Sequence, residues 1–154
     1  FTVVRNPYTR ILSAYLDKIQ KSYHAPKFRP PLGFGLPDVE EVTFGDFLRR
    51  IREIPIREIN PHFQPQWLIL SLNKSITYDF IGRFENLESD LQALLRHIGD
   101  EKFNGSNRVS RRPHATHAGE KLRQYYGIEE QALVSEIYED DFKYLGYGYD
   151  LDLA

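Results

Sequence analysis

The first thirteen residues place an arginine and a serine where they could bind a phosphate. Five residues that favour β structure end in Arg5 and are followed at once by Asn6 and Pro7. Asparagine is a preferred N-cap, and proline is tolerated at the first helical position. The predicted strand end therefore brings a guanidinium and backbone N–H groups to the carboxyl edge of a sheet, where α/β proteins bind ligands. An arginine offers a forked pair of donors to a phosphate.

Ser13 lies about two turns along the predicted helix, on a face that it shares with Arg10 and Asp17. Its hydroxyl would add a donor if a phosphate lay along the flank of the helix. Physical reasoning alone leaves an ordinary alternative open, in which Arg5 pairs with a carboxylate and Ser13 is a surface residue.

Three further residue types could do chemistry. His62 stands in a proline-flanked loop and could act as a general base, although a structural hydrogen bond is the commoner role. Glu85 follows a second predicted strand, where it could contact a sugar hydroxyl, but helix capping is favoured. His114 and His117 indicate no metal site, because no acidic or cysteine ligand stands at a suitable spacing and the neighbouring arginines repel cations.

The elements that must position these residues follow from the spacing of apolar side chains. Strands are predicted at residues 1–5 and 76–84, and proline- or charge-rich loops at 23–42 and 100–117, while 57–72 stay unassigned. Helices are predicted over residues 7–19, 44–54, 87–98, 118–126 and 129–147. Because two parallel strands alone are marginal, further strands are expected before Phe1, in agreement with the lack of any methionine.

The composition limits the partners and the compartment. The 154 residues carry a net charge of −2, with basic residues gathered at 102–123 and acidic ones at 129–152. A local basic patch suits a small polyanion better than a nucleic-acid duplex, so no nucleic-acid partner is predicted. No apolar run approaches the roughly 20 residues of a membrane span. The absence of cysteine favours a reducing compartment.

The order R-N-P-x-x-R-x-x-S-x-Y, which begins at Arg5 and ends at Tyr15, resembles the 3′-phosphate-binding motif of sulfotransferases. These enzymes use 3′-phosphoadenosine-5′-phosphosulfate (PAPS). The segments "NPHFQPQ", "YDFIGRFENLESDL" and "IYEDDFKYLGY" are similar to later signatures of the carbohydrate branch of that family and occur in the same order. The likeness runs from Phe1 to about Tyr147.

The resemblance implies an α/β fold of the three-layer, P-loop nucleotide-kinase-like kind, with a parallel sheet and a helix-rich C-terminal half. Residues 1–154 would form a single, partial sulfotransferase domain whose N-terminal part is missing. The implied reaction transfers the sulfuryl group of PAPS to a hydroxyl, expected on a carbohydrate, without a metal. A bacterial cytoplasm is favoured by the lack of cysteine, with the Golgi lumen, where many relatives act, as the alternative.

The resemblance also implies roles for individual residues. Arg5 and Ser13 would hold the 3′-phosphate, and the loop "NRVSRRPHAT" would close over the nucleotide with Arg111, Arg112 and Thr116. His62 matches the family's histidine and is the candidate base within this chain, although the base could precede Phe1.

One family feature has no counterpart in the sequence. The lysine-bearing phosphosulfate loop should precede the opening motif and is absent, so the isolated 154 residues are expected to be inactive. Two other functions stay open: a fragment of another phosphate-binding enzyme, such as a nucleotide kinase, or a non-catalytic helical module whose basic loop binds an acidic partner.

Overall fold

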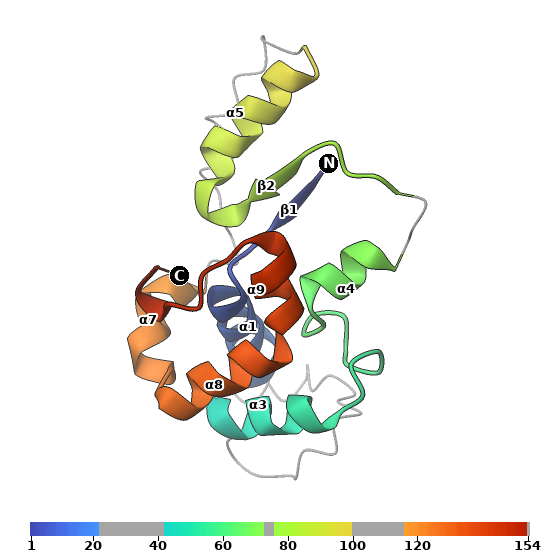
Figure 1. Ribbon diagram of the computed structural model, residues 1–154. Helices are drawn as coiled ribbons and strands as arrows, with labels where there is room; N and C mark the ends of the chain where they lie inside the picture. Colours follow the sequence, from blue (N-terminus) through green and yellow to red (C-terminus); the bar gives the residue numbers. More distant parts are fainter. Residues whose placement is uncertain (22–41, 73–75, 100–115, 154) are drawn as a thin grey trace.

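A small parallel sheet stands between one helix and a larger group of helices (Figure 1). The computed structural model describes residues 1–21, 42–72, 76–99 and 116–153. Strand β1 (Thr2–Val4) pairs with β2 (Ile81–Arg83), and the register joins Thr2 to Ile81 and Val4 to Arg83. Both strands and their parallel direction agree with the sequence prediction, although β2 is shorter than the predicted 76–84.

Helix α1 (Pro7–Tyr15) is the central helix and continues as a π-helical turn, η1 (Leu16–Gln20). It begins as predicted, because the Asn6 side chain accepts a hydrogen bond of 2.9 Å from the Tyr8 N–H. Figure 1 shows α1 among α3, α7, α8 and α9. Its predicted apolar stripe is buried throughout and consists of Tyr8, Ile11, Leu12, Tyr15, Leu16 and Ile19. The opposite flank is left for polar residues.

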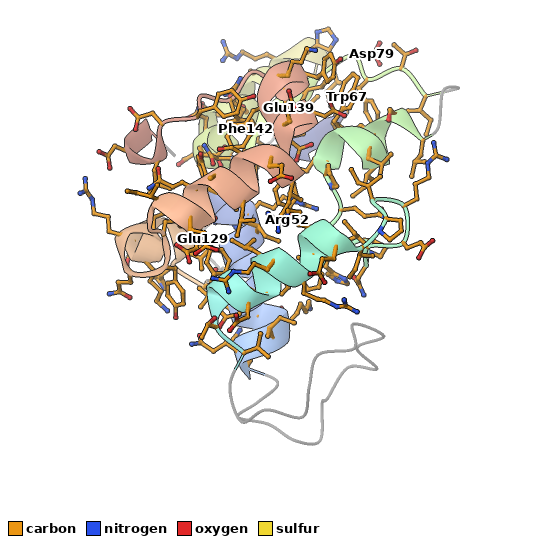
Figure 2. The ribbon with its side chains drawn as sticks, turned by 60° about the horizontal axis from the view of Figure 1, so that its bottom comes forward. Arg52, Trp67, Asp79, Glu129, Glu139 and Phe142 are labelled. Carbon is orange, nitrogen blue, oxygen red and sulfur yellow. The ribbon has the colours of Figure 1, made fainter. Side chains whose placement is uncertain are left out.

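Helix α3 (Phe44–Glu53) also begins where local signals predict. The Thr43 hydroxyl oxygen accepts a hydrogen bond of 3.2 Å from the Asp46 N–H, which caps the helix. Its apolar face packs against α8 (Ile128–Ile137). Ion pairs cross the outer side of this contact, with Arg49 2.8 Å from Glu129, and Figure 2 shows Arg52 and Glu129 on the two helices. These exposed pairs add little to stability compared with the buried face.

Three more α-helices lie between α3 and α8 among the described residues. Helix α4 (Gln66–Ser71) lies in the segment that the sequence left unassigned, and α7 (Ala118–Tyr125) matches its predicted position. Helix α5 (Leu87–His97) follows a 3₁₀ turn, η3 (Phe84–Asn86), and Gly99 ends it with φ +79°. Of the predicted apolar face of α5 only Leu94 is buried, while Ile98 is 63% exposed.

The prediction of one helix over 129–147 is wrong, because the chain forms α8 and α9 (Glu139–Leu145) with a break at Tyr138. Tyr138 has φ −112° and ψ 26°, and its buried hydroxyl donates a 2.7 Å hydrogen bond to the Phe63 carbonyl oxygen. The break lets α8 pack on α3 while α9 packs on α4 (Figure 1). A short 3₁₀ turn, η4 (Leu151–Leu153), follows.

The predicted loops at 23–42 and 100–117 lie almost entirely outside the described residues. Within the part of the chain that is described, no helix combines the length and the apolar character needed to cross a membrane.

Candidate functional site

A groove of about 320 Å³ opens beside α1 and collects most of the predicted site residues. The lining comes from four separate stretches of the chain and consists of Arg5, Arg10, Ser13, Ala14, Asp17, Lys18, His62 and Thr116. Arg5, Ser13, His62 and Thr116 are therefore brought together. Arg111 and Arg112 lie outside the described residues.

The helical repeat explains why so much of the lining comes from one helix. Arg10, Ser13 and Asp17 recur at three and four residues on the flank opposite the buried stripe, as the sequence predicts. The π-helical turn carries Asp17 and Lys18. Such turns are rare and occur often at functional sites. The helix thus forms one wall of the groove.

Arg5 stands between the last residue of β1 and the N-cap of α1. Its Nε donates a 3.1 Å hydrogen bond to the Thr9 hydroxyl, and its guanidinium carbon lies 4.6 Å from the centre of the Phe84 ring. Hydrogen bonding and a cation–π contact therefore orient the planar group at the edge of the groove.

Two of the backbone N–H groups at the start of α1, which the sequence offers to an anion, already donate within the protein. The Asn6 N–H donates to Glu85 Oε1 at 2.8 Å, and the Tyr8 N–H donates to the Asn6 side chain. Glu85 is thus a helix cap, but for α1 rather than for the helix that follows it, and it also accepts from the Tyr147 hydroxyl at 3.2 Å. These two N–H groups are therefore not available to an anion.

Ser13 and Thr116 join two sides of the groove, because their hydroxyl oxygens lie 2.8 Å apart. Thr116 precedes His117, which has φ +51° and leads into α7. The ring Nδ1 of His117 lies 3.2 Å from Glu120 Oε1. Among the described residues no three His, Cys, Asp or Glu side chains form a group that could hold a metal ion, and His114 lies outside them.

His62 has a defined proton arrangement. Its ring Nδ1 lies 2.8 Å from Asn60 Oδ1, and the same oxygen accepts the His62 backbone N–H at 3.0 Å. Because an amide oxygen only accepts hydrogen bonds, Nδ1 must carry the proton. In the neutral ring, Nε2 is then the basic nitrogen, which is the arrangement that a general base needs.

Positive charge exceeds negative charge along the groove. Among the described residues that line it, Arg5, Arg10 and Lys18 are cationic and Asp17 is the one carboxylate. The Asp17 carboxylate is 2.7 Å from Lys21 and 2.9 Å from Lys18, and hydrogen bonds from these lysines lower the pKa of Asp17 to about 2. The excess of cationic groups favours an anionic ligand.

Sequence reasoning missed two features of the site. Lys18 was not proposed, although its spacing of four residues from Ala14 places it on the groove side of the helix. Gln66, within the segment "NPHFQPQ", binds the backbone of Arg5 through hydrogen bonds of 2.8 and 2.7 Å. No local signal reveals that contact, because 61 residues separate the two.

Comparisons with known proteins identify the family of this chain. The model of the "Sulfotransferase family" matches residues 1–148. Carbohydrate sulfotransferase 14 of Mus musculus is 32% identical over 107 residues, which cover 64% of this chain and 28% of that protein. Carbohydrate sulfotransferase 10 of Gallus gallus is 25% identical over 169 residues, which cover 96% of this chain and 46% of that protein. The chain spans less than half the length of these relatives. No solved structure matches it.

The predicted bacterial cytoplasm is wrong. The relatives that match it come from eukaryotes, among them Mus musculus, Homo sapiens and Gallus gallus. The physical reason for the error is simple. A chain without cysteine has no thiol to oxidise, so its composition is compatible with reducing and oxidising compartments alike.

Proposed function

Because this chain belongs to the sulfotransferase family, we propose that its groove binds the 3′-phosphate of PAPS. The sulfuryl group of PAPS then passes to a hydroxyl, and the names of the relatives support a carbohydrate as the acceptor. One observation carries the proposal: Arg5 and Ser13, eight residues apart, line the same cationic groove. The Arg5 guanidinium, just before α1, and the Ser13 hydroxyl, on α1, supply donors to one phosphate.

Arg10 and Lys18 extend the positive charge of the site. A phosphate at pH 7 carries close to two negative charges, and both side chains lie on the same flank of the helix as Ser13. Contacts with this remote phosphate help to align the reacting atoms, since binding energy far from the reaction positions the transferred group. Arg111 and Arg112 are also proposed to contact the nucleotide, on the basis of the family resemblance of their segment alone.

His62 is the proposed base. Its Nε2 removes the proton of the acceptor hydroxyl while that oxygen forms a bond to sulfur. The bond between sulfur and the bridging oxygen of the 5′-phosphate breaks, and the electron pair stays on the nucleotide. Asn60 keeps the proton on Nδ1 and so keeps Nε2 available. No metal takes part in this scheme.

The fold proposed for residues 1–154 is one domain of the three-layer, P-loop nucleotide-kinase-like type. Two features support it. The strands β1 and β2 are parallel, and each leads into a helix, α1 or α5, within a few residues. Units of this kind are the building blocks of doubly wound sheets.

Thermal unfolding tests the proposal in the full-length protein. At about 100 times its Kd, 3′-phosphoadenosine 5′-phosphate should raise Tm by about 5 to 10 °C, since such binding stabilises by about 2.7 kcal/mol. Arg5→Ala should abolish the increase, whereas Arg96→Ala, an exposed site on α5, should retain it. ATP with magnesium should give a smaller shift. An unchanged shift in Arg5→Ala would contradict the proposal.

A further inference from the structure

A side-chain amide holds the backbone of Arg5 from outside the sheet. Gln66, the first residue of α4, accepts the Arg5 N–H through Oε1 at 2.8 Å and donates to the Arg5 carbonyl through Nε2 at 2.7 Å. The two bonds reproduce those that a neighbouring strand would make. They matter because Arg5 belongs to neither β1 nor α1.

A buried carboxylate fixes this amide in turn. Asp141, on α9, is 0% exposed, and its Oδ2 accepts from the Gln66 N–H at 2.9 Å and from Gln66 Nε2 at 3.3 Å. Its Oδ1 accepts the Trp67 N–H at 2.7 Å. These bonds cap α4, whose N-cap, Pro65, makes no side-chain cap. In Figure 2, Trp67 of α4 and Glu139 of α9 mark the junction of the two helices.

The arrangement permits only one orientation of the Gln66 amide. Nε2 stands between two acceptors, the Arg5 carbonyl and Asp141 Oδ2. A flipped amide would bring its oxygen against both acceptors and its NH₂ group against the Arg5 N–H. Asp141 Oδ2 and the Arg5 carbonyl together therefore fix the orientation in which Gln66 presents an acceptor to the Arg5 N–H. Burial raises the pKa of Asp141, and the three N–H donors oppose that change.

We propose that Gln66 and Asp141 are positioning residues for Arg5. They hold the end of β1 so that the guanidinium meets the 3′-phosphate, and they contact no part of the ligand themselves. This inference rests on the proposed function of the groove. The start of α9 also supports His62. Tyr138, just before α9, donates through its hydroxyl to the carbonyl oxygen of Phe63, the residue that follows His62.

The test measures how strongly the 3′-phosphate contributes to affinity. Calorimetry on the full-length protein gives the Kd of 3′-phosphoadenosine 5′-phosphate and that of adenosine 5′-phosphate. The wild type should prefer the former. Gln66→Met removes both bonds to Arg5 at similar volume and should reduce the preference about tenfold. Asp141→Asn should also reduce this preference. Asp140 is the exposed neighbour of Asp141, and Asp140→Asn should leave the preference unchanged.

A double-mutant cycle separates positioning from general damage to the fold. In an Arg5→Ala background, Gln66→Met should cause no further loss of preference, because the group that it positions is gone. Should Asp141→Asn fail to fold, Gln66→Met carries the test. An equal loss of affinity for both nucleotides, or an unchanged ratio in a folded Gln66→Met variant, would overturn the inference. A wild type without any preference would instead refute the proposed function.

Discussion

The hydroxyl oxygens of Ser13 and Thr116 lie 2.8 Å apart, although 103 residues separate them in the chain. In such a pair one hydroxyl donates and the other accepts. Ser13 keeps its own proton for a ligand only when Thr116 donates to it. The direction of the Ser13 O–H therefore depends on whether the Thr116 hydroxyl donates or accepts.

This relationship predicts an order of effects. Ser13→Ala should weaken binding of 3′-phosphoadenosine 5′-phosphate about tenfold or more, because a hydrogen bond to a charged group contributes about 1.5–3 kcal/mol. Thr116→Val should weaken it only about two- to fivefold, since it removes a neutral hydrogen bond. Thr116→Ser should restore wild-type affinity. Calorimetry measures all three. A larger loss in Thr116→Val than in Ser13→Ala would indicate that Thr116 contacts the nucleotide directly.

The Asp17 carboxylate is negatively charged and lines a groove that also holds the cationic side chains of Arg10 and Lys18. Asp17→Asn removes the carboxylate and releases Lys18 from its 2.9 Å ion pair. We therefore expect the variant to bind 3′-phosphoadenosine 5′-phosphate a few times more tightly at low salt, an effect that should fade as salt screens it. Glu53→Gln, at an exposed position on α3, is a matched control for charge and should leave the Kd unchanged. Weaker binding by Asp17→Asn would show that the carboxylate contacts the ligand.

The same side chain should affect stability in the opposite direction. The pKa of Asp17 is lowered from 3.8 to about 2, so its ion pairs stabilise the folded state above about pH 4 and lose that effect as the pH falls toward 2. At pH 7 we expect Asp17→Asn to lower the free energy of unfolding by about 0.5–1 kcal/mol. Urea unfolding between pH 2 and pH 7 measures the difference. A difference that stays constant over this range would contradict the assignment.

Much of the local structure could be predicted, because its causes lie within a few residues. Asn6 and Pro7 fix the start of α1, and Thr43 with Asp46 fixes the start of α3. The shared flank of Arg10, Ser13 and Asp17 follows from the helical repeat, and it forms one wall of the groove. These parts of the fold and of the candidate site depend on spacing alone.

The remaining features depend on contacts between distant residues. The apolar spacing runs without interruption through Tyr138, so it does not predict the break there, where the Tyr138 hydroxyl donates to the distant Phe63 carbonyl oxygen. The amide of Gln66 reaches Arg5 across 61 residues, and Asp141 reaches Gln66 across 75. The family resemblance offers His62 as the candidate base, but its place in the same groove as Ser13 does not follow from any spacing.

The hydroxyl of Tyr138 should contribute measurably to stability. Tyr138→Phe leaves the Phe63 carbonyl oxygen without its buried donor, which should lower the free energy of unfolding by about 1–2 kcal/mol. Chemical denaturation measures the loss. Tyr149→Phe, at a side chain that is 52% exposed, should change it by less than about 0.5 kcal/mol. Equal effects of the two substitutions would remove the role assigned to the buried bond.

His62 should affect turnover more than binding. His62→Gln should lower kcat about a hundredfold or more, the usual contribution of a general base, and change the Kd of 3′-phosphoadenosine 5′-phosphate less than twofold. Transfer of radiolabelled sulfate from PAPS to a panel of unsulfated polysaccharides measures kcat in the full-length protein. A variant with wild-type turnover would require another base.

The distant origin of the groove walls has a consequence for how the protein acquires its site during folding. Ser13 meets Thr116 only after a loop of more than a hundred residues has closed, and closure of long loops is entropically costly and slow. Helix α1 has its start signals within its own sequence, but the proposed nucleotide site is complete only when the segment that begins at Thr116 has docked. Recovery of nucleotide binding after dilution from urea should therefore not precede recovery of helical content.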